Sequence, residues 1–432
     1  MKSSADTILE LRYGSGIQRA TLPSDWRHHR LRTAPPPAGR SEDDVIKETL
    51  ANPFGPTLHD FLNPADPLLI LVSDKTRRCQ TRVFLPHILS VVHAAGIPRE
   101  RVQILFASGT HAAQSETDKR VILGDEIYDQ YLVREHDARD EDRCVELGVT
   151  RFGTPVRVNR LLADAVQVIA TGTIVHHYFA GFGGGAKLFV PGVSAYSTAV
   201  ANHRRTITDD GRFHPGCADG NTEGNPVIED ILDARRFMPP HWYFAALMDE
   251  QGHIVDGVCG EMESAHREGC RRVDARFRCP IESAADLTIV SAGGYPKDIN
   301  FIQSHKALHH ASYATKEGGG IICLAECRDG IGNDHFLEWF AEKDEHSFRD
   351  ALRTRYAMNA HTALAMREKA RRHRIIFVSS LPDTAVRTMG MHAAPTLEIA
   401  MRMMQGMVPV QADVALLENG SLTVPYLRPA HK

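Results

Sequence analysis

The chain has 432 residues, enough for two or more domains that each bury their own core. Hydrophobic residues make up 43%, charged residues 24%, and the formal net charge is -4. This balance is typical of a globular protein and gives no reason to expect nucleic acid or an acidic membrane as a partner. No apolar run reaches the length of a membrane span or a signal-peptide core, so we expect a cytoplasmic protein.

The N-terminal part of the chain predicts a hairpin and then a helix. Residues 7–22 alternate around Gly14-Ser15-Gly16, which predicts a β-hairpin. Ser41, with Asp44 at the capping-box position, predicts the start of a helix.

Two continuous apolar runs predict strands that are buried on both faces of a sheet. They are residues 68–72 and 102–106, and a helix over residues 83–95 joins them. The first strand is followed by Asp74-Lys75-Thr76-Arg77 and the second by Ser108-Gly109-Thr110-His111. Ligands of open α/β sheets bind beyond the carboxyl ends of the strands, so we expect both clusters to face one crevice.

A third buried strand, predicted over residues 165–170, leads into an unusual stretch that the same rule sends to the same crevice. Its glycines allow positive φ and a close approach of the backbone to a ligand. The stretch contains, in order, two adjacent histidines, four glycines, one lysine and a third histidine, among them His176, His177, Gly184, Gly185, Lys187 and His203.

The remaining residues predict a second α/β unit. Gly318 to Gly320 are expected to end a helix, and the last segment, DVALLENGSLTVPYL, resembles a hairpin that packs on the first domain. The other expected elements are helices over 226–237, 262–276, much of 347–371 and 396–405, and strands over 287–291, 321–325 and 375–378.

The glycine-rich stretch does not match the common nucleotide-binding motifs. A P-loop places Ser or Thr after the lysine, whereas Leu188 follows Lys187, and no G-x-G-x-x-G opens a helix. The backbone N–H groups can still hold a phosphate. Two alternatives stay open: a zinc hydrolase that uses His111, His177 and His203, and a nickel- or nucleotide-binding protein without catalytic activity.

Five motifs together resemble those of the nickel-dependent lactate racemase family, which includes other 2-hydroxyacid racemases and epimerases. They are D-x-T-R at residues 74–77, G-T-H at 109–111, H-[YF]-F-A-G-F-x-G-G-x-K at 177–187, N-H at 202–203 and Q-x-x-K at 303–306. They span most of the chain in the family's order, and the long motif is highly specific. The resemblance implies an isomerase that inverts the C2 stereocentre of a 2-hydroxy acid.

The resemblance also implies a nickel pincer nucleotide, pyridinium-3-thioamide-5-thiocarboxylic acid mononucleotide, which other proteins synthesise and deliver. Lys187 would carry this cofactor covalently, and His203 would be the protein ligand of nickel. The other implied cofactor contacts are Asp74, Lys75, Thr76, Arg77, Gly184 and Gly185.

A pair of histidines suits such a reaction for a physical reason. The α-proton of a 2-hydroxy acid is very weakly acidic beside a carboxylate, and removal of hydride avoids the carbanion. One histidine takes the hydroxyl proton as hydride leaves for the cofactor, and the other serves the opposite face of the planar 2-oxo acid. The resemblance assigns these roles to His111 and His177, and it assigns substrate binding to Arg77, Gln303 and Lys306.

Some positions depart from the lactate-specific members of the family. Ile302 stands where those members tend to carry tyrosine, and no tryptophan occurs in residues 357–362, where Asn359 and His361 lie. A larger or more polar 2-hydroxy acid, such as malate, is therefore expected as readily as lactate. His176 is expected to be structural or to support His177.

We therefore predict an α/β protein of two domains with mainly parallel sheets flanked by helices. Residues 1–277 with 411–432 are expected to form the N-terminal domain, which binds the cofactor and is catalytic. Residues 278–410 are expected to form a C-terminal domain that closes over the substrate, with the active site in the cleft between the domains.

Overall fold

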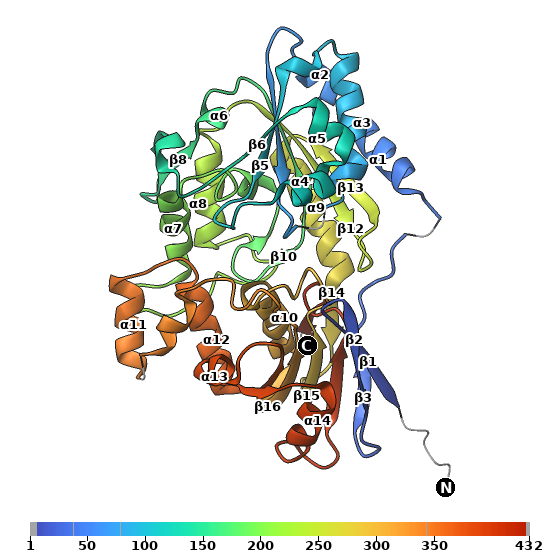
Figure 1. Cartoon of the computed structure of the whole chain (residues 1–432), viewed down its shortest axis with the longest axis vertical. Helices are drawn as coiled ribbons and strands as arrows, with labels where there is room; N and C mark the ends of the chain where they lie inside the picture. Colours follow the sequence, from blue (N-terminus) through green and yellow to red (C-terminus); the bar gives the residue numbers. More distant parts are fainter. Residues whose placement is uncertain (1–6, 38, 78, 343, 429–432) are drawn as a thin grey trace. The chain divides into compact units, whose positions relative to one another are not determined.

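The computed structural model describes residues 7–37, 39–77, 79–342 and 344–428 (Figure 1). The chain divides into two compact units. The N-terminal unit consists of Pro35–Thr206 and His214–Arg276; the C-terminal unit consists of the described residues up to Ala34, Ile207–Phe213, and those from Phe277 onward. Each unit contains a six-stranded, largely parallel sheet with helices packed on it, which confirms the predicted fold class.

The sheet of the N-terminal unit is parallel apart from one antiparallel edge strand. All six residues of β4 are buried, as the apolar run predicts. β9 begins at Val168 rather than Ala165, because the backbone N–H of Ala165 still bonds to Leu162 in the preceding turn. The spatial order of the strands is β13 (Ile254–Gly260), β12 (His241–Met248), β9 (Val168–Thr173), β4 (Leu68–Ser73), β5 (Val102–Ala107) and β6 (Leu132–Glu135).

Local signals set the starts of two predicted helices in this unit. Ser41 accepts the backbone N–H of Asp44 before α1 (Glu42–Ala51), and Asn225 caps α8 (Pro226–Arg235), whose first residue is proline. The other helices are α2 (Leu58–Phe61), α3 (Thr81–Ala94), α4 (Glu116–Leu123), α5 (Asp125–Gln130), α6 (Arg160–Ala163), α7 (Tyr196–His203) and α9 (Met262–Phe277). The small strand pairs are β7 (Cys144–Val149) with β8 (Pro155–Asn159), and β10 (His176–His177) with β11 (Gly181–Phe182).

The sheet of the C-terminal unit is parallel throughout. Its strands, in spatial order, are β18 (His392–Ala394), β17 (Arg374–Val378), β16 (Thr315–Leu324), β15 (Ala285–Ser291), β19 (Asp413–Leu417) and β3 (Arg27–Arg30). Its helices are α10 (Phe301–Tyr313), α11 (Glu345–Thr354), α12 (Ala360–Arg372), α13 (Asp383–Thr388) and α14 (Leu397–Gln405).

The predicted N-terminal hairpin is confirmed, and it belongs to the C-terminal unit. β1 (Ile8–Tyr13) and β2 (Gly16–Thr21) pair around the predicted turn. The hairpin buries Leu9 and Leu11 in the same core cluster as α14, where Met401 and Met404 are buried.

The two ends of the chain are placed differently from the prediction. β19 and β20 (Val424–Leu427) do not form a hairpin: β19 inserts between β15 and β3, and β20 pairs with β14 (Arg278–Ile281). Because β3 and β19 extend the second sheet, the segments 7–34 and 411–428 lie in the C-terminal unit, whereas the sequence analysis assigned them to the N-terminal domain.

One further difference concerns the glycines at residues 318–320. The predicted helix stop at Gly318 to Gly320 is wrong, because these glycines lie within β16. A Cβ at Gly320 would stand 2.5 Å from the sulfur of Met404 on α14.

All eight cysteines are free and buried. Within the described part of the chain, no helix combines the length and the apolar character that a membrane crossing requires.

Candidate active site

The three sequence clusters that were predicted to converge follow three neighbouring strands of the N-terminal unit. β9, β4 and β5 are adjacent and parallel, so their carboxyl ends lie at one edge of the sheet. The chain winds from β4 to β5 in one direction and later places β9 on the other side of β4. Ligands of doubly wound sheets bind beside such a change of winding direction.

Asp74 and His111, from the loops after β4 and β5, are hydrogen-bonded. Nδ1 of His111 meets Oδ2 of Asp74, and since a carboxylate only accepts, Nδ1 is the protonated nitrogen. Burial of Asp74 (3% exposed) by itself raises the pKa of its carboxyl. His111, Arg77 and the Thr76 hydroxyl outweigh burial and hold this pKa below its ordinary value. Nε2 of His111 is thereby left as an acceptor, which is what a general base needs.

The turn after β4 is held by its own side chains and by α4. Thr76 donates from its backbone N–H and from its hydroxyl to Oδ1 of Asp74, at 3.2 and 2.7 Å. The backbone N–H of Lys75 donates to the side chain of Gln114 at 2.8 Å, and the Lys75 ammonium lies 2.9 Å from Asp118. These contacts fix the backbone, and a cofactor contact of Lys75 stays a prediction.

Lys187 is a buried lysine on a single 3-10 turn, η3 (Gly185–Leu188). Gly184 and Gly185 before it have φ of 76° and 57°, the left-handed region that glycine tolerates best. Lys187 is 9% exposed. Burial, with a smaller contribution from the nearby Arg77 guanidinium, lowers the pKa of its amine to about 7. Much of this amine is therefore neutral near neutral pH, as a nucleophilic lysine requires.

Phe179 joins three of the predicted functional side chains. Its ring centroid lies 4.4 Å from that of His177 and 5.0 Å from that of His203, both in edge-to-face geometry. The Lys187 ammonium lies 5.2 Å from the same centroid. Nδ1 of His177 accepts the backbone N–H of Ala180 at 3.4 Å, so the neutral ring carries its proton on Nε2. His177, Lys187 and His203 are thus gathered around one aromatic ring, and no role had been predicted for Phe179.

The asparagine of the N-H motif explains how His203 is held. Asn202 is fully buried beside His203 at the end of α7. Its amide donates to the backbone oxygen of Val227 at 3.0 Å and to Asp230 at 2.8 Å, both on α8. These bonds fix the helix end that presents the His203 imidazole.

The residues from His176 to Lys187, called the glycine segment below, have supports that the sequence analysis missed. The Tyr243 hydroxyl on β12 accepts the backbone N–H of Gly185 at 3.0 Å, and Nε2 of His266 on α9 lies 3.0 Å from the Gly183 oxygen. His176 itself, expected to be structural or to support His177, lies 3.0 Å from Asp274 of α9. None of these supporting residues belongs to a motif. The sequence signal for His266 and Asp274 was the spacing of polar residues along α9, which places these two on one side of the helix.

The C-terminal unit carries the remaining predicted residues. Gln303 and Lys306 lie one turn apart at the start of α10, and the Lys306 ammonium donates to the Gln303 side-chain oxygen at 2.9 Å. The Tyr356 hydroxyl and Nδ1 of His361 are 2.7 Å apart, and Ile302 packs against the core of the unit. The contacts of these residues with a substrate stay predictions.

The implied cofactor can be compared with the side chains present. His203 offers a buried imidazole, an ordinary nickel donor, and Lys187 offers a buried and partly neutral amine for attachment. Both lie against Phe179, so the donor chemistry fits the implied group. Over the described ranges, no group of three or more His, Cys, Asp or Glu side chains is arranged to hold a metal, and the trio of the zinc alternative is not such a group.

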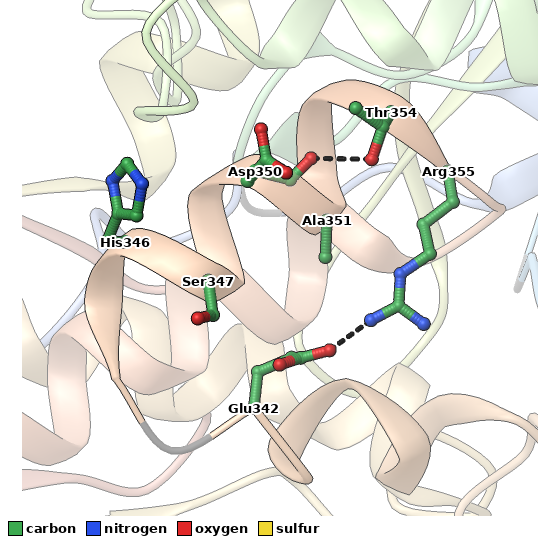
Figure 2. A pocket seen from close by; sticks show the side chains of 7 residues that line it. All are labelled: Glu342, His346, Ser347, Asp350, Ala351, Thr354 and Arg355. Atoms are coloured by element: carbon green, nitrogen blue, oxygen red, sulfur yellow. Dashed lines mark hydrogen bonds and ion pairs between the residues drawn. The ribbon is translucent and has the colours of Figure 1, made fainter.

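A small pocket in the C-terminal unit contains none of the predicted site residues. It lies along α11, and Glu342 and Arg355 form an ion pair across it (Figure 2). Figure 2 labels the seven lining residues, Glu342, His346, Ser347, Asp350, Ala351, Thr354 and Arg355.

Comparisons with known proteins agree in both units. Family models described as lactate racemase N-terminal domain and lactate racemase C-terminal domain match residues 13–214 and 281–424. The lactate racemase of Thermoanaerobacterium thermosaccharolyticum is 31% identical over 343 residues, 78% of each chain. The lactate racemase of Lactiplantibacillus plantarum is 30% identical over 387 residues, 88% of this chain and 90% of that protein.

Solved structures give the same likeness. The lactate racemase apoprotein from T. thermosaccharolyticum superposes with a TM-score of 0.88 at 28% identity, and the match covers 98% of this chain and 100% of that one. A protein from Thermotoga maritima, at 16% identity, shares the fold with a TM-score of 0.71 over 91% of this chain and 100% of that one.

Proposed function

Because this chain belongs to the lactate racemase family and is therefore an isomerase, we propose that it inverts the C2 stereocentre of a 2-hydroxy acid with a nickel pincer nucleotide. The observation that carries the proposal is the single cluster in the N-terminal unit. Asp74 binds His111, and Arg77 acts electrostatically on both Asp74 and Lys187. Lys187 lies over the aromatic ring that also contacts His177 and His203.

Lys187 and His203 are the residues that would hold the cofactor. The Lys187 amine, with a pKa of about 7, is partly neutral near neutral pH, the form in which an amine could carry the cofactor through a thioamide. His203 would bind nickel through its imidazole. The cofactor, when bound, supplies an acceptor that takes hydride from C2 and returns it.

His111 is the better-defined base of the proposed pair. Its Nδ1–H is directed to Asp74, so Nε2 is free to take the proton of the substrate hydroxyl. The lowered pKa of Asp74 keeps the carboxylate ionised, and this charge stabilises the imidazolium that forms.

His177 would serve the opposite enantiomer. Its neutral form carries the proton on Nε2, because Nδ1 accepts the Ala180 N–H, so it is set to donate to the oxygen of a 2-oxo acid. To transfer a proton to that oxygen, His177 would have to be the imidazolium while His111 is neutral, because a neutral imidazole is too weak an acid. One inversion would then move the hydroxyl proton to His111 and a proton from His177 to the oxygen, which leaves His111 protonated and His177 neutral for the reverse direction.

The substrate carboxylate would be bound by cations. The Arg77 guanidinium can form two parallel hydrogen bonds with it. We propose that Lys306 and Gln303 also bind the substrate. The two relatives described above are named for lactate; the polar Tyr356–His361 pair leads us to include larger or more polar 2-hydroxy acids.

The decisive experiment follows the label on C2. The protein is produced together with the cofactor-synthesis enzymes, and a panel of 2-hydroxy acids deuterated at C2 is racemised in ordinary water. Chiral chromatography with mass spectrometry is expected to show inversion with deuterium retained, because hydride returns to the carbon it left. Inversion with loss of deuterium to water would refute the hydride proposal and indicate proton abstraction.

Variants and mass measurements separate the alternatives. His111→Ala and His177→Ala should each abolish inversion, whereas the exposed His335→Ala should not. An added mass at Lys187 supports the racemase. Tightly bound zinc with esterase or amidase activity would instead support the hydrolase, and nickel without an organic cofactor or inversion would support a binding protein.

A further inference from the structure

One face of α9 is fitted to the glycine segment. His266 and Asp274 are eight residues apart, so they project from the same side of the helix. His266 reaches the Gly183 oxygen, and Asp274 reaches the His176 ring, each at 3.0 Å. α9 therefore holds the segment at two separate points.

The glycines of this region are required by the protein packing itself. A Cβ at Gly185 would stand 2.7 Å from the His266 ring, and one at Gly184 would stand 2.6 Å from the oxygen of Thr173 and 2.9 Å from the Tyr243 hydroxyl. The segment thus lies directly on α9 and β12. This contact is a second reason for the glycines, in addition to the predicted close approach of the backbone to a ligand.

We propose that His266, Asp274 and Tyr243 are positioning residues, which hold the glycine segment in the conformation that places Lys187 and His177. The proposal rests on the functions proposed for Lys187 and His177. All three residues lie between the stretches that the two family models match, 13–214 and 281–424.

The chemistry of each support suits its place. Burial lowers the pKa of the half-buried His266, so its ring is neutral near neutral pH and a single N–H can be directed to the Gly183 oxygen. The Tyr243 hydroxyl accepts the Gly185 N–H, which would otherwise be a buried donor without an acceptor at the start of the 3-10 turn. Neither His266 nor Tyr243 brings a charge toward Lys187, so these two residues preserve the environment that lowers the pKa of Lys187.

The test uses the apoprotein and does not depend on turnover. The pKa of Lys187 is measured from the pH dependence of its labelling by an amine reagent, with peptide mapping. Hydrogen exchange of the amides of residues 174–187 is measured by mass spectrometry. The variants are His266→Leu, His266→Gln, Tyr243→Phe, Asp274→Leu and Asp274→Asn, with His93→Leu as the matched control, since His93 is a half-buried histidine of the same unit that also bonds a backbone oxygen.

His266→Leu and Tyr243→Phe are expected to raise the pKa of Lys187 by about one unit or more, as the turn opens to water. Both variants, together with Asp274→Leu, should accelerate exchange in the segment about tenfold. His266→Gln and Asp274→Asn should restore the wild-type values, because they keep the donor and the acceptor. Tyr243→Phe removes one oxygen atom only and so tests the proposal even where His266→Leu fails to fold.

Unchanged exchange and an unchanged Lys187 pKa in His266→Leu and Tyr243→Phe would overturn the proposal. An equal effect of His93→Leu would also overturn it, because the response would then be general loosening of the unit. Failure of racemisation in the wild-type protein would refute the proposed function and leave these readouts intact, so the two failures are distinguishable.

Discussion

Replacing Lys187 by methionine is expected to stabilise the apoprotein near neutral pH. Burial, with help from Arg77, shifts the pKa of Lys187 from 10.5 to about 7. At 1.36 kcal/mol for each pKa unit, charging this amine costs about 5 kcal/mol more in the folded protein than in the unfolded chain. Methionine has a similar unbranched shape and no charge, so Lys187→Met should remove most of this cost.

The sign of the pH dependence follows from the direction of the shift. In the unfolded chain Lys187 holds its proton below a pH of about 10.5, whereas in the folded protein it holds it only below about pH 7. As the pH falls through this window the unfolded state holds one more proton, and the stability of the wild type decreases by about 1.4 kcal/mol per pH unit. The advantage of Lys187→Met should therefore be greatest at pH 7 and below, and vanish near pH 10.

Urea denaturation of the two proteins at several pH values between 6.5 and 10 measures this difference. The midpoints should separate toward pH 7 while the slopes stay equal. Lys47→Met, which changes an exposed lysine on α1, is the control and should show no such gain. A stability difference that is the same at every pH, or a less stable Lys187→Met at pH 7, would show that Lys187 is not held in an environment that opposes its charge.

Three other outcomes are expected. Asp74→Asn should lower kcat by about 10²–10⁴-fold because His111 loses the charge that stabilises its protonated form, and a kcat within twofold of the wild type would count against the pair. Gly185→Ala should lower the free energy of unfolding, measured by urea denaturation, by about 2–4 kcal/mol, because of its positive φ and the contact with His266. Gly330 also has positive φ but lies in open space, so Gly330→Ala should lower it by about 1–2 kcal/mol. Equal losses in the two variants would contradict the packing argument. Burial holds the pKa of His305 well below 6.5, so only the unfolded state binds this proton as the pH falls below 6.5. The free energy of unfolding should therefore drop by about 1.4 kcal/mol per pH unit. His305→Phe should flatten this pH profile, and an unaltered slope in the variant would refute the assignment to His305.

Elements with strong local signals were predictable from the sequence. The apolar runs of β4 and β5 mark strands buried on both faces, and Ser41 and Pro226 mark helix starts through contacts only a few residues away. Because β4 and β5 are neighbouring parallel strands, Asp74 and His111, which follow them, could be predicted to lie at the same edge of the sheet.

What the sequence did not reveal depends on contacts between distant residues. The pairing of Arg27 with Asp413 decides which unit holds the two ends of the chain, and no local pattern encodes it. Gly320 was predicted to stop a helix, but its lack of a side chain instead makes room for Met404. The supports from His266 and Tyr243 are single hydrogen bonds to the backbone, and such bonds leave no motif.

The pairing of β3 with β19 also bears on the order in which the protein folds during synthesis. The second sheet needs residues 27–30 beside 413–417, so it cannot be completed until nearly the whole chain has left the ribosome. The N-terminal unit is finished by Arg276, and it can fold while the remainder is still being made. β3 is therefore synthesised long before its partner β19, and the whole N-terminal unit is made between them.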